Sequence, residues 1–170
     1  MKKRIIGLLA AATMLLGVSA SAAEAVERDY APEEGKGWLV VEINGEEVEF
    51  EYTSSTKGMT GTTHNFEAED YTMALVFNKK LVVGEEMDKN AIAQIEIMSH
   101  ATADNGYYFA KKAAGKDVVS TVTLAENETE GVLQGEFTVT VPTADRYVGD
   151  NKPGILPELE LTEGEFCFFE

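Results

Sequence analysis

The sequence has 170 residues, of which 30 are acidic and 14 basic, so its formal net charge at pH 7 is −16. Such an acidic chain repels nucleic acid and anionic membrane surfaces, and we exclude nucleic acid as a partner. The single cysteine, Cys167, excludes an intrachain disulfide. We expect it to be a buried apolar side chain, and a disulfide with another chain is the alternative that stays open.

Residues 1–23 have the pattern of a cleavable signal peptide. A basic N-terminal end precedes an uncharged run from Ile5 to Val18, and small residues follow it. This run is shorter than the roughly 20 apolar residues that a membrane-spanning helix needs. We therefore expect an exported protein, periplasmic or extracellular, with cleavage after Ala22 or Ala23 and no transmembrane segment in the mature chain.

The mature chain is expected to begin with a flexible polar leader over residues 24–36, followed by one domain over residues 37–170. Trp38 to Ile43 reads as a strand, and Asn44-Gly45 predicts a two-residue hairpin turn. In the next strand, apolar residues alternate with glutamates from Glu47 to Tyr52. This alternation predicts one buried and one solvated face.

The rest of the chain continues the pattern of short strands. Thr53 to Thr63 is rich in Thr, Ser and Gly and predicts a loop, and three prolines confine 142–157 to a long loop or a sheet edge. Eight or nine short strands predict an all-β fold, a single antiparallel β-sandwich that is immunoglobulin-like or jelly-roll-like. The stretches after Thr63 that read as extended are 64–66, 71–77, 81–83, 93–98, 107–109, 118–124, 133–141, 159–161 and 166–168, from which, with the first hairpin, we expect eight or nine strands.

A divalent cation is one candidate ligand, because Ca²⁺ prefers carboxylate, amide and carbonyl oxygens. The best group of such side chains is Asp145, Asp150 and Asn151 in the long loop. Asx residues are also common in turns for conformational reasons, and none of these residues has EF-hand spacing. The interpretation as a calcium site therefore competes with plain turn chemistry.

A glycan is the second candidate ligand, because sugars stack on exposed aromatic rings. Tyr107 and Tyr108 are the most suggestive pair, since successive strand positions send one ring inward and the next outward. Packing of both rings in the core is the competing interpretation.

No nucleophile lies in a glycine-bounded elbow, and the two histidines, His64 and His100, carry no metal-ligand spacing. A zinc or copper site would need both histidines together with a carboxylate such as Glu67 or Asp70, whereas we expect exposed loop histidines. Two of the 30 acids facing a cleft would suffice for glycoside hydrolysis, but the sequence does not select a pair.

The C-terminal half contains Gly106-Tyr107-Tyr108, then a G-x-F strand at 135–137 and a T-x-G-x-F ending at 162–166. In these motifs it resembles the small secreted β-sandwich domains of unknown function found in bacterial cell envelopes. It implies a sandwich and carries no activity across.

Together these observations predict a secreted, acidic binding module without enzymatic activity, whose ligand is a divalent cation or a glycan. Two other hypotheses stay open: a hydrolase that uses paired carboxylates or a His-ligated metal, and a structural or inhibitory module with a protein partner.

Overall fold

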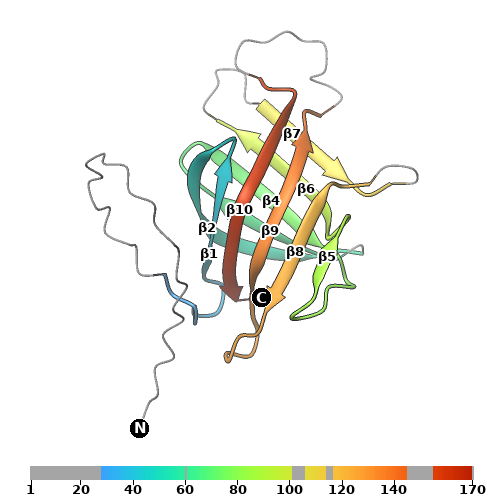
Figure 1. Ribbon diagram of the computed structural model, residues 1–170. Helices are drawn as coiled ribbons and strands as arrows, with labels where there is room; N and C mark the ends of the chain where they lie inside the picture. Colours follow the sequence, from blue (N-terminus) through green and yellow to red (C-terminus); the bar gives the residue numbers. More distant parts are fainter. Residues whose placement is uncertain (1–27, 60, 101–105, 114–116, 145–154, 170) are drawn as a thin grey trace, which may run out of the picture.

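A computed structural model describes residues 28–59, 61–100, 106–113, 117–144 and 155–169 (Figure 1). Within these ranges there are ten strands and no helix. The strands are β1 (Gly37–Ile43), β2 (Glu46–Lys57), β3 (Thr62–Glu67), β4 (Tyr71–Phe77), β5 (Glu86–Asp88), β6 (Ile92–Ser99), β7 (Gly106–Lys111), β8 (Ser120–Ala125), β9 (Val132–Pro142) and β10 (Glu158–Phe169).

All ten strands belong to one sheet, in the order β5-β8-β9-β10-β1-β2-β3-β4-β6-β7, and every named pair is antiparallel. The all-β, antiparallel prediction is confirmed. The prediction of a sandwich with eight or nine strands is not confirmed, because the chain forms a single continuous sheet whose first and last long strands, β1 and β10, pair with each other.

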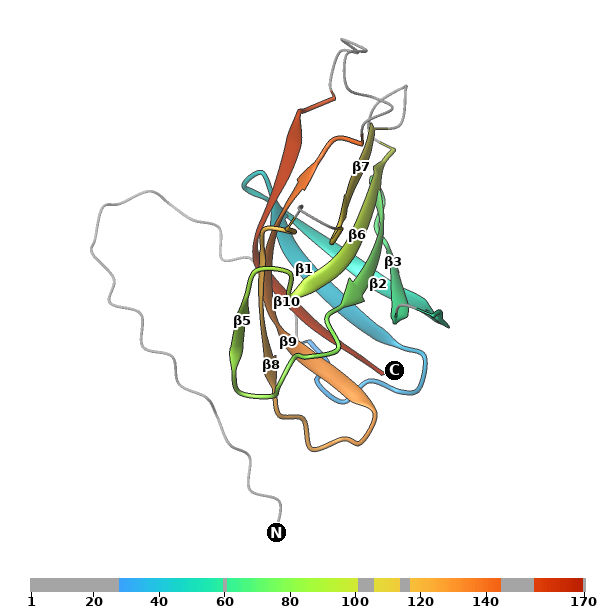
Figure 2. The ribbon, with the colours of Figure 1, turned by 90° about the vertical axis from the view of Figure 1, so that its right-hand side faces the viewer.

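The sheet curls into a half-barrel around its inner face (Figures 1 and 2). A front wall of β8, β9 and β10 faces a rear wall of β3, β4 and β6, and β1 and β2 join them. The edge strand β7 approaches the end of β9, where Tyr108 forms a bridge with Thr143 and the Ala144 N–H donates to the Tyr107 carbonyl over 3.0 Å. These contacts draw the walls together at one end.

The first hairpin forms as predicted. Asn44 and Gly45 both have positive φ, 53° and 85°, and they join Ile43 to Glu46 in a two-residue turn. Positive φ at both central residues is the requirement of the turn type that suits strand twist, and Asn-Gly meets it at little cost.

The core lies between the two walls and is rich in aromatic rings. Phe166 and Phe168 on β10 are fully buried, with ring centroids 5.7 Å apart. Leu159 and Leu161, on the same strand, are also buried although their numbers have the opposite parity. A register shift between Leu161 and Gly164 accounts for this, because one extra residue turns the following side chains to the other face of a strand.

A smaller apolar cluster lies on the outer face of the sheet. It contains Trp38, Val40 and Cys167, with Val132 packed against it. Cys167 is fully buried, as predicted, and lies opposite Trp38 in the β1–β10 pair. The Trp38 indole N–H donates to the Asp29 carbonyl over 2.7 Å, so residues that precede β1 lie against this cluster.

None of the described segments forms a helix long and apolar enough to cross a membrane.

Candidate functional site

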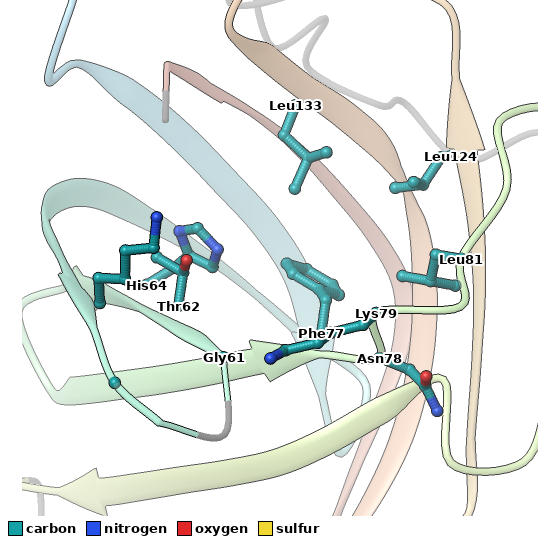
Figure 3. Close-up of a pocket in the computed structure, with 11 residues that line it drawn as sticks. Gly61, Thr62, His64, Phe77, Asn78, Lys79, Leu81, Leu124 and Leu133 are labelled. Atoms are coloured by element: carbon teal, nitrogen blue, oxygen red, sulfur yellow. The ribbon is translucent and has the colours of Figure 1, made fainter.

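A cavity of about 270 Å³ opens between the front and rear walls, at the end of the half-barrel where β2 and β4 finish (Figure 3). In the close-up, His64 and Phe77 of the rear wall face Leu124 and Leu133 of the front wall. We call this space the mouth cavity. It is lined by Lys57, Gly58, Gly61, Thr62, His64, Phe77, Asn78, Lys79, Leu81, Leu124 and Leu133.

The end of β2 and the start of β3 contribute Lys57 and Thr62 to the mouth cavity, and both strands are longer than the sequence predicts. Thr53 to Thr63 was expected to be a loop, and that expectation is wrong: β2 runs on to Lys57 and β3 begins at Thr62. Threonine is a good strand former. A register shift between Tyr52 and Ser54 lets the two strands stay paired as they bend.

His64 is part of the wall of the cavity rather than an exposed loop residue, which corrects the expectation from sequence. It is 3 % exposed, on β3, and its ring centroid lies 4.7 Å from that of Phe168, 5.9 Å from that of Phe77 and 6.4 Å from that of Tyr52. The imidazole is therefore enclosed by aromatic rings.

The turn after β4 forms one side of the mouth cavity. The Asn78 side-chain oxygen accepts from the Lys80 N–H over 3.0 Å, and the Asn78 carbonyl accepts from the Leu81 N–H over 3.1 Å. This side-chain capped turn is a common use of asparagine. It places Leu81 in the cavity lining and leaves Lys79 exposed beside it.

The charge at the mouth is opposite in sign to that of the chain. Lys57 and Lys79 line the cavity, and no Asp or Glu is among its described lining residues. A shallow hollow of about 380 Å³ on the outer face shows the contrast, because it is bordered by four glutamates: Glu86, Glu136, Glu163 and Glu165. The mouth thus combines four apolar side chains with two lysines, on an acidic protein.

A larger cavity, of about 640 Å³, lies where β7 meets the start of β8 and the end of β9. Its lining includes Phe109, Val119, Lys111 and Lys112, and it also carries the acids Asp117 and Glu158. Ala113, Asp117 and Ala144 also line it, and segments 114–116 and 145–154 lie outside the described residues. Its mixed charge favours no one class of ligand.

Tyr107 and Tyr108 point to opposite faces of β7, as the alternation of a strand requires. Tyr108 is 3 % exposed and belongs to the core, and its hydroxyl accepts a hydrogen bond from the Leu156 N–H over 3.2 Å. Tyr107 is half-buried and lies beside Phe109, with ring centroids 6.4 Å apart and ring planes within 8°.

The predicted calcium ligands Asp145, Asp150 and Asn151 lie outside the described residues. Within the part of the chain that the structure does describe, no three His, Cys, Asp or Glu side chains are grouped so as to hold a metal ion.

The two histidines are held apart by the sheet. His64 is opposite Leu75 on β4, whereas His100 follows Ser99, which is opposite Tyr71 on the same strand. His100 is therefore level with Asp70, and the five residues from Leu75 to Asp70 correspond to roughly 17 Å along a strand. His100 is exposed, and its N–H donates to the Asp70 carbonyl over 2.7 Å. The geometry does not assemble a two-histidine metal site.

The mouth cavity was not among the sites predicted from sequence. Its residues come from five strands and two turns, and the one signal available was the pair of lysines, Lys57 and Lys79, in a chain with few bases. Comparison with family models finds no match, and neither curated proteins nor solved structures show significant similarity to the chain. The function is therefore argued from geometry.

Proposed function

We propose that the protein is a non-enzymatic binding module whose mouth cavity takes a small amphipathic anion, with an apolar body and one acidic group. The observation that carries the proposal is the lining itself. It has four apolar side chains and two lysines, together with Thr62, His64 and Asn78, and no described acid, on a chain whose net charge is −16. Ligand pockets have this composition in general, mostly apolar with a few polar groups that orient the ligand.

The apolar body of the ligand would lie between Phe77 and Leu81 of the rear side and Leu124 and Leu133 of the front wall. Burial of apolar surface favours binding by about 25 cal/mol per Å². The volume of about 270 Å³ lies just below the usual range for drug-sized ligands, so it suits a small molecule.

The acidic group would meet Lys57 and Lys79, which are exposed at the rim. The ammonium groups of lysines are compact charges on flexible stems, so they can follow a carboxylate without a rigid geometry. An uncharged analogue of the ligand would lose this attraction and would have to bind on apolar burial alone.

Titration of the purified protein with decanoate and with decanol, at matched ionic strength, tests the proposal. We expect the anion to bind more tightly than the alcohol, and Lys57→Gln/Lys79→Gln to remove most of that difference. The matched control is Lys111→Gln/Lys112→Gln, which neutralises two exposed lysines at the larger cavity. If the control variant weakens binding and the mouth variant does not, the mouth is not the site.

Glycan binding is a second candidate, because Tyr107 and Phe109 present nearly parallel rings on the outer face of β7. Such rings are the usual stacking surface for a sugar. Under this proposal Tyr107→Ala reduces retention on a polysaccharide column, and equal retention of the variant and the parent would count against it.

Export is also a proposal, and it rests on the pattern of residues 1–23. N-terminal sequencing of the protein recovered from a bacterial culture tests it, and an uncut N-terminus would contradict it.

A further inference from the structure

A smaller cavity lies on the outer face of the sheet, and its lining differs from that of the mouth cavity. Its volume is about 220 Å³, and Trp38 forms one side of it, so we call it the Trp38 cavity. It is lined by Tyr30, Trp38, Thr123, Ala125, Gln134, Gly135, Glu136, Glu165 and Phe166. Aromatic rings and two carboxylates therefore share one small space, whereas the mouth carries lysines.

The carboxylates are close because of the strand register. Glu136 on β9 lies directly opposite Glu165 on β10. Like charges directly opposite each other in a sheet destabilise it, and a cation between them relieves the repulsion. The position of the pair is set by β-pairing, so the two acids are held together whether or not a cation is present.

Arg28 already contacts both an aromatic ring and one of these carboxylates. The Arg28 guanidinium lies over the Trp38 ring, with its carbon 5.3 Å from the ring centroid, and pairs with Glu165 over 3.3 Å. Attraction of a cation to an indole face and to a carboxylate act together here. The face of the sheet thus accepts an organic cation in a defined place.

Arg28 neutralises one of the two carboxylates. Arg28–Glu165 is the sole ion pair among the described residues, so Glu136 has no cationic partner within them. Glu136 is exposed, Tyr30 is 48 % exposed, and both line the cavity. The Glu136 carboxylate and the accessible Tyr30 ring therefore remain available to a ligand in the cavity next to Arg28.

We propose that the Trp38 cavity binds an alkylammonium group, which pairs with Glu136 and lays its methylene chain against Tyr30 and Trp38. Gln134 adds a polar side chain to the same lining. The volume of about 220 Å³ is below that of a drug-sized site, so the cavity takes a group of side-chain size. The source is either a lysine side chain of another protein or a free aliphatic amine.

The segment that carries Arg28 and Tyr30 is fastened to the sheet by its backbone. The Asp29 carbonyl accepts from the Trp38 indole, and the Tyr30 carbonyl accepts from the Asn127 side chain over 2.8 Å. These bonds keep the rings of Tyr30 and Trp38 edge to face, with centroids 5.4 Å apart. The aromatic side of the cavity is therefore formed before any ligand arrives.

Calorimetric titration of the purified protein tests the inference with three probes at matched ionic strength: pentylamine, N-acetyl-lysine amide and sodium chloride. We expect one or both amines to bind and sodium to give no saturable signal. Loss of one charge-assisted pair in Glu136→Gln should weaken amine binding by about tenfold or more. Tyr30→Ala should weaken it as well, and because the Tyr30 ring is 48 % exposed we expect this variant to keep the fold.

Glu47→Gln is the matched control, because Glu47 is an exposed glutamate on the hairpin strand β2 and lines neither cavity. If Glu136→Gln and Glu47→Gln bind amines as the parent does, the amines act as counterions to an acidic surface and the inference is wrong. If only the lysine derivative binds, the natural source is a protein side chain; if pentylamine binds equally well, it is a free amine.

Discussion

Asn90, just before β6, is hydrogen-bonded to Asp117 and Val118, just before β8. Replacing Asn90 tests how much these bonds stabilise the half-barrel. Its N–H donates to the Val118 carbonyl, its side-chain oxygen accepts from the Val118 N–H, and its amide nitrogen donates to Asp117, each over 2.9 Å. Its own carbonyl accepts from the Asn78 side chain, also over 2.9 Å. Asn90 also has a φ of 53°, in the left-handed region.

The size of the effect follows from these contacts. Any residue without the amide leaves the N–H of Val118, which is 2 % exposed, without its partner, at a cost of about 1–3 kcal/mol. Asn90→Ala costs about 1 kcal/mol more, because alanine adopts positive φ less easily than asparagine. Asn90→Gly does not carry this extra cost, because glycine adopts positive φ freely. We therefore expect Asn90→Gly to cost about 1–3 and Asn90→Ala about 2–4 kcal/mol.

Thermal unfolding followed by the fluorescence of Trp38, the one tryptophan of the chain, measures these costs. At about 4 °C per kcal/mol, Asn90→Ala should lower Tm by about 8–16 °C and Asn90→Gly by about 4 °C less. Asp117→Ala is the control, because Asp117 is exposed and its loss removes one hydrogen bond worth about 1 kcal/mol. An Asn90→Gly variant as stable as the parent would refute the reasoning.

Two further predictions concern burial and close packing. Burial, with a smaller effect of Asp29, raises the pKa of Cys167 from 9.0 to about 11. The fold therefore favours the neutral thiol, and the stability that this gives is full below pH 9 and is lost as the pH rises from 9 to 11. Burial also raises the pKa of Tyr71, so Tyr71 contributes to the loss of stability at alkaline pH. The difference between the urea midpoints at pH 8 and pH 11 should therefore be smaller, but not zero, in Cys167→Ala than in the parent. An equal difference in variant and parent would contradict the role of the thiol. A Cβ on Gly164 would lie 2.4 Å from the Phe137 ring, so Gly164→Ala should cost about 1–3 kcal/mol, with partial rescue by Phe137→Leu. Gly58→Ala, whose Cβ meets its nearest neighbour at 3.4 Å, should be close to neutral in the same melting experiment, and equal melting of the two alanine variants would count against the packing argument.

The first hairpin could be predicted from the sequence, whereas the paired ends of β2 and β3 could not. Asn44-Gly45 selects its turn through its own backbone preferences, so the prediction needs no other part of the chain. The strand from Thr53 to Lys57 has a loop-like composition, and it is extended because β3 pairs with it from Thr62 onward. Pairing between strands overrides a weak local preference.

The candidate ligands show the same division. Alternation placed Tyr107 and Tyr108 on opposite faces of a strand, and the structure puts Tyr108 in the core. The sequence could not indicate which of the 30 acids meet, since the Glu136–Glu165 pair depends on the register of β9 with β10. The aromatic surroundings of His64 depend in the same way on Phe168, which reaches it from the far end of the chain.

The sequence by itself determined the all-β class, the two-faced strands and the Asn44-Gly45 turn, because each follows from side chains a few residues apart. Only the tertiary structure decided that the strands form one curled sheet, that its mouth is basic and apolar, and that Trp38 shares a cavity with two glutamates. The reason is that these features depend on strand order and on the register shifts at Tyr52 and Leu161, and local sequence preferences do not specify pairing between distant segments.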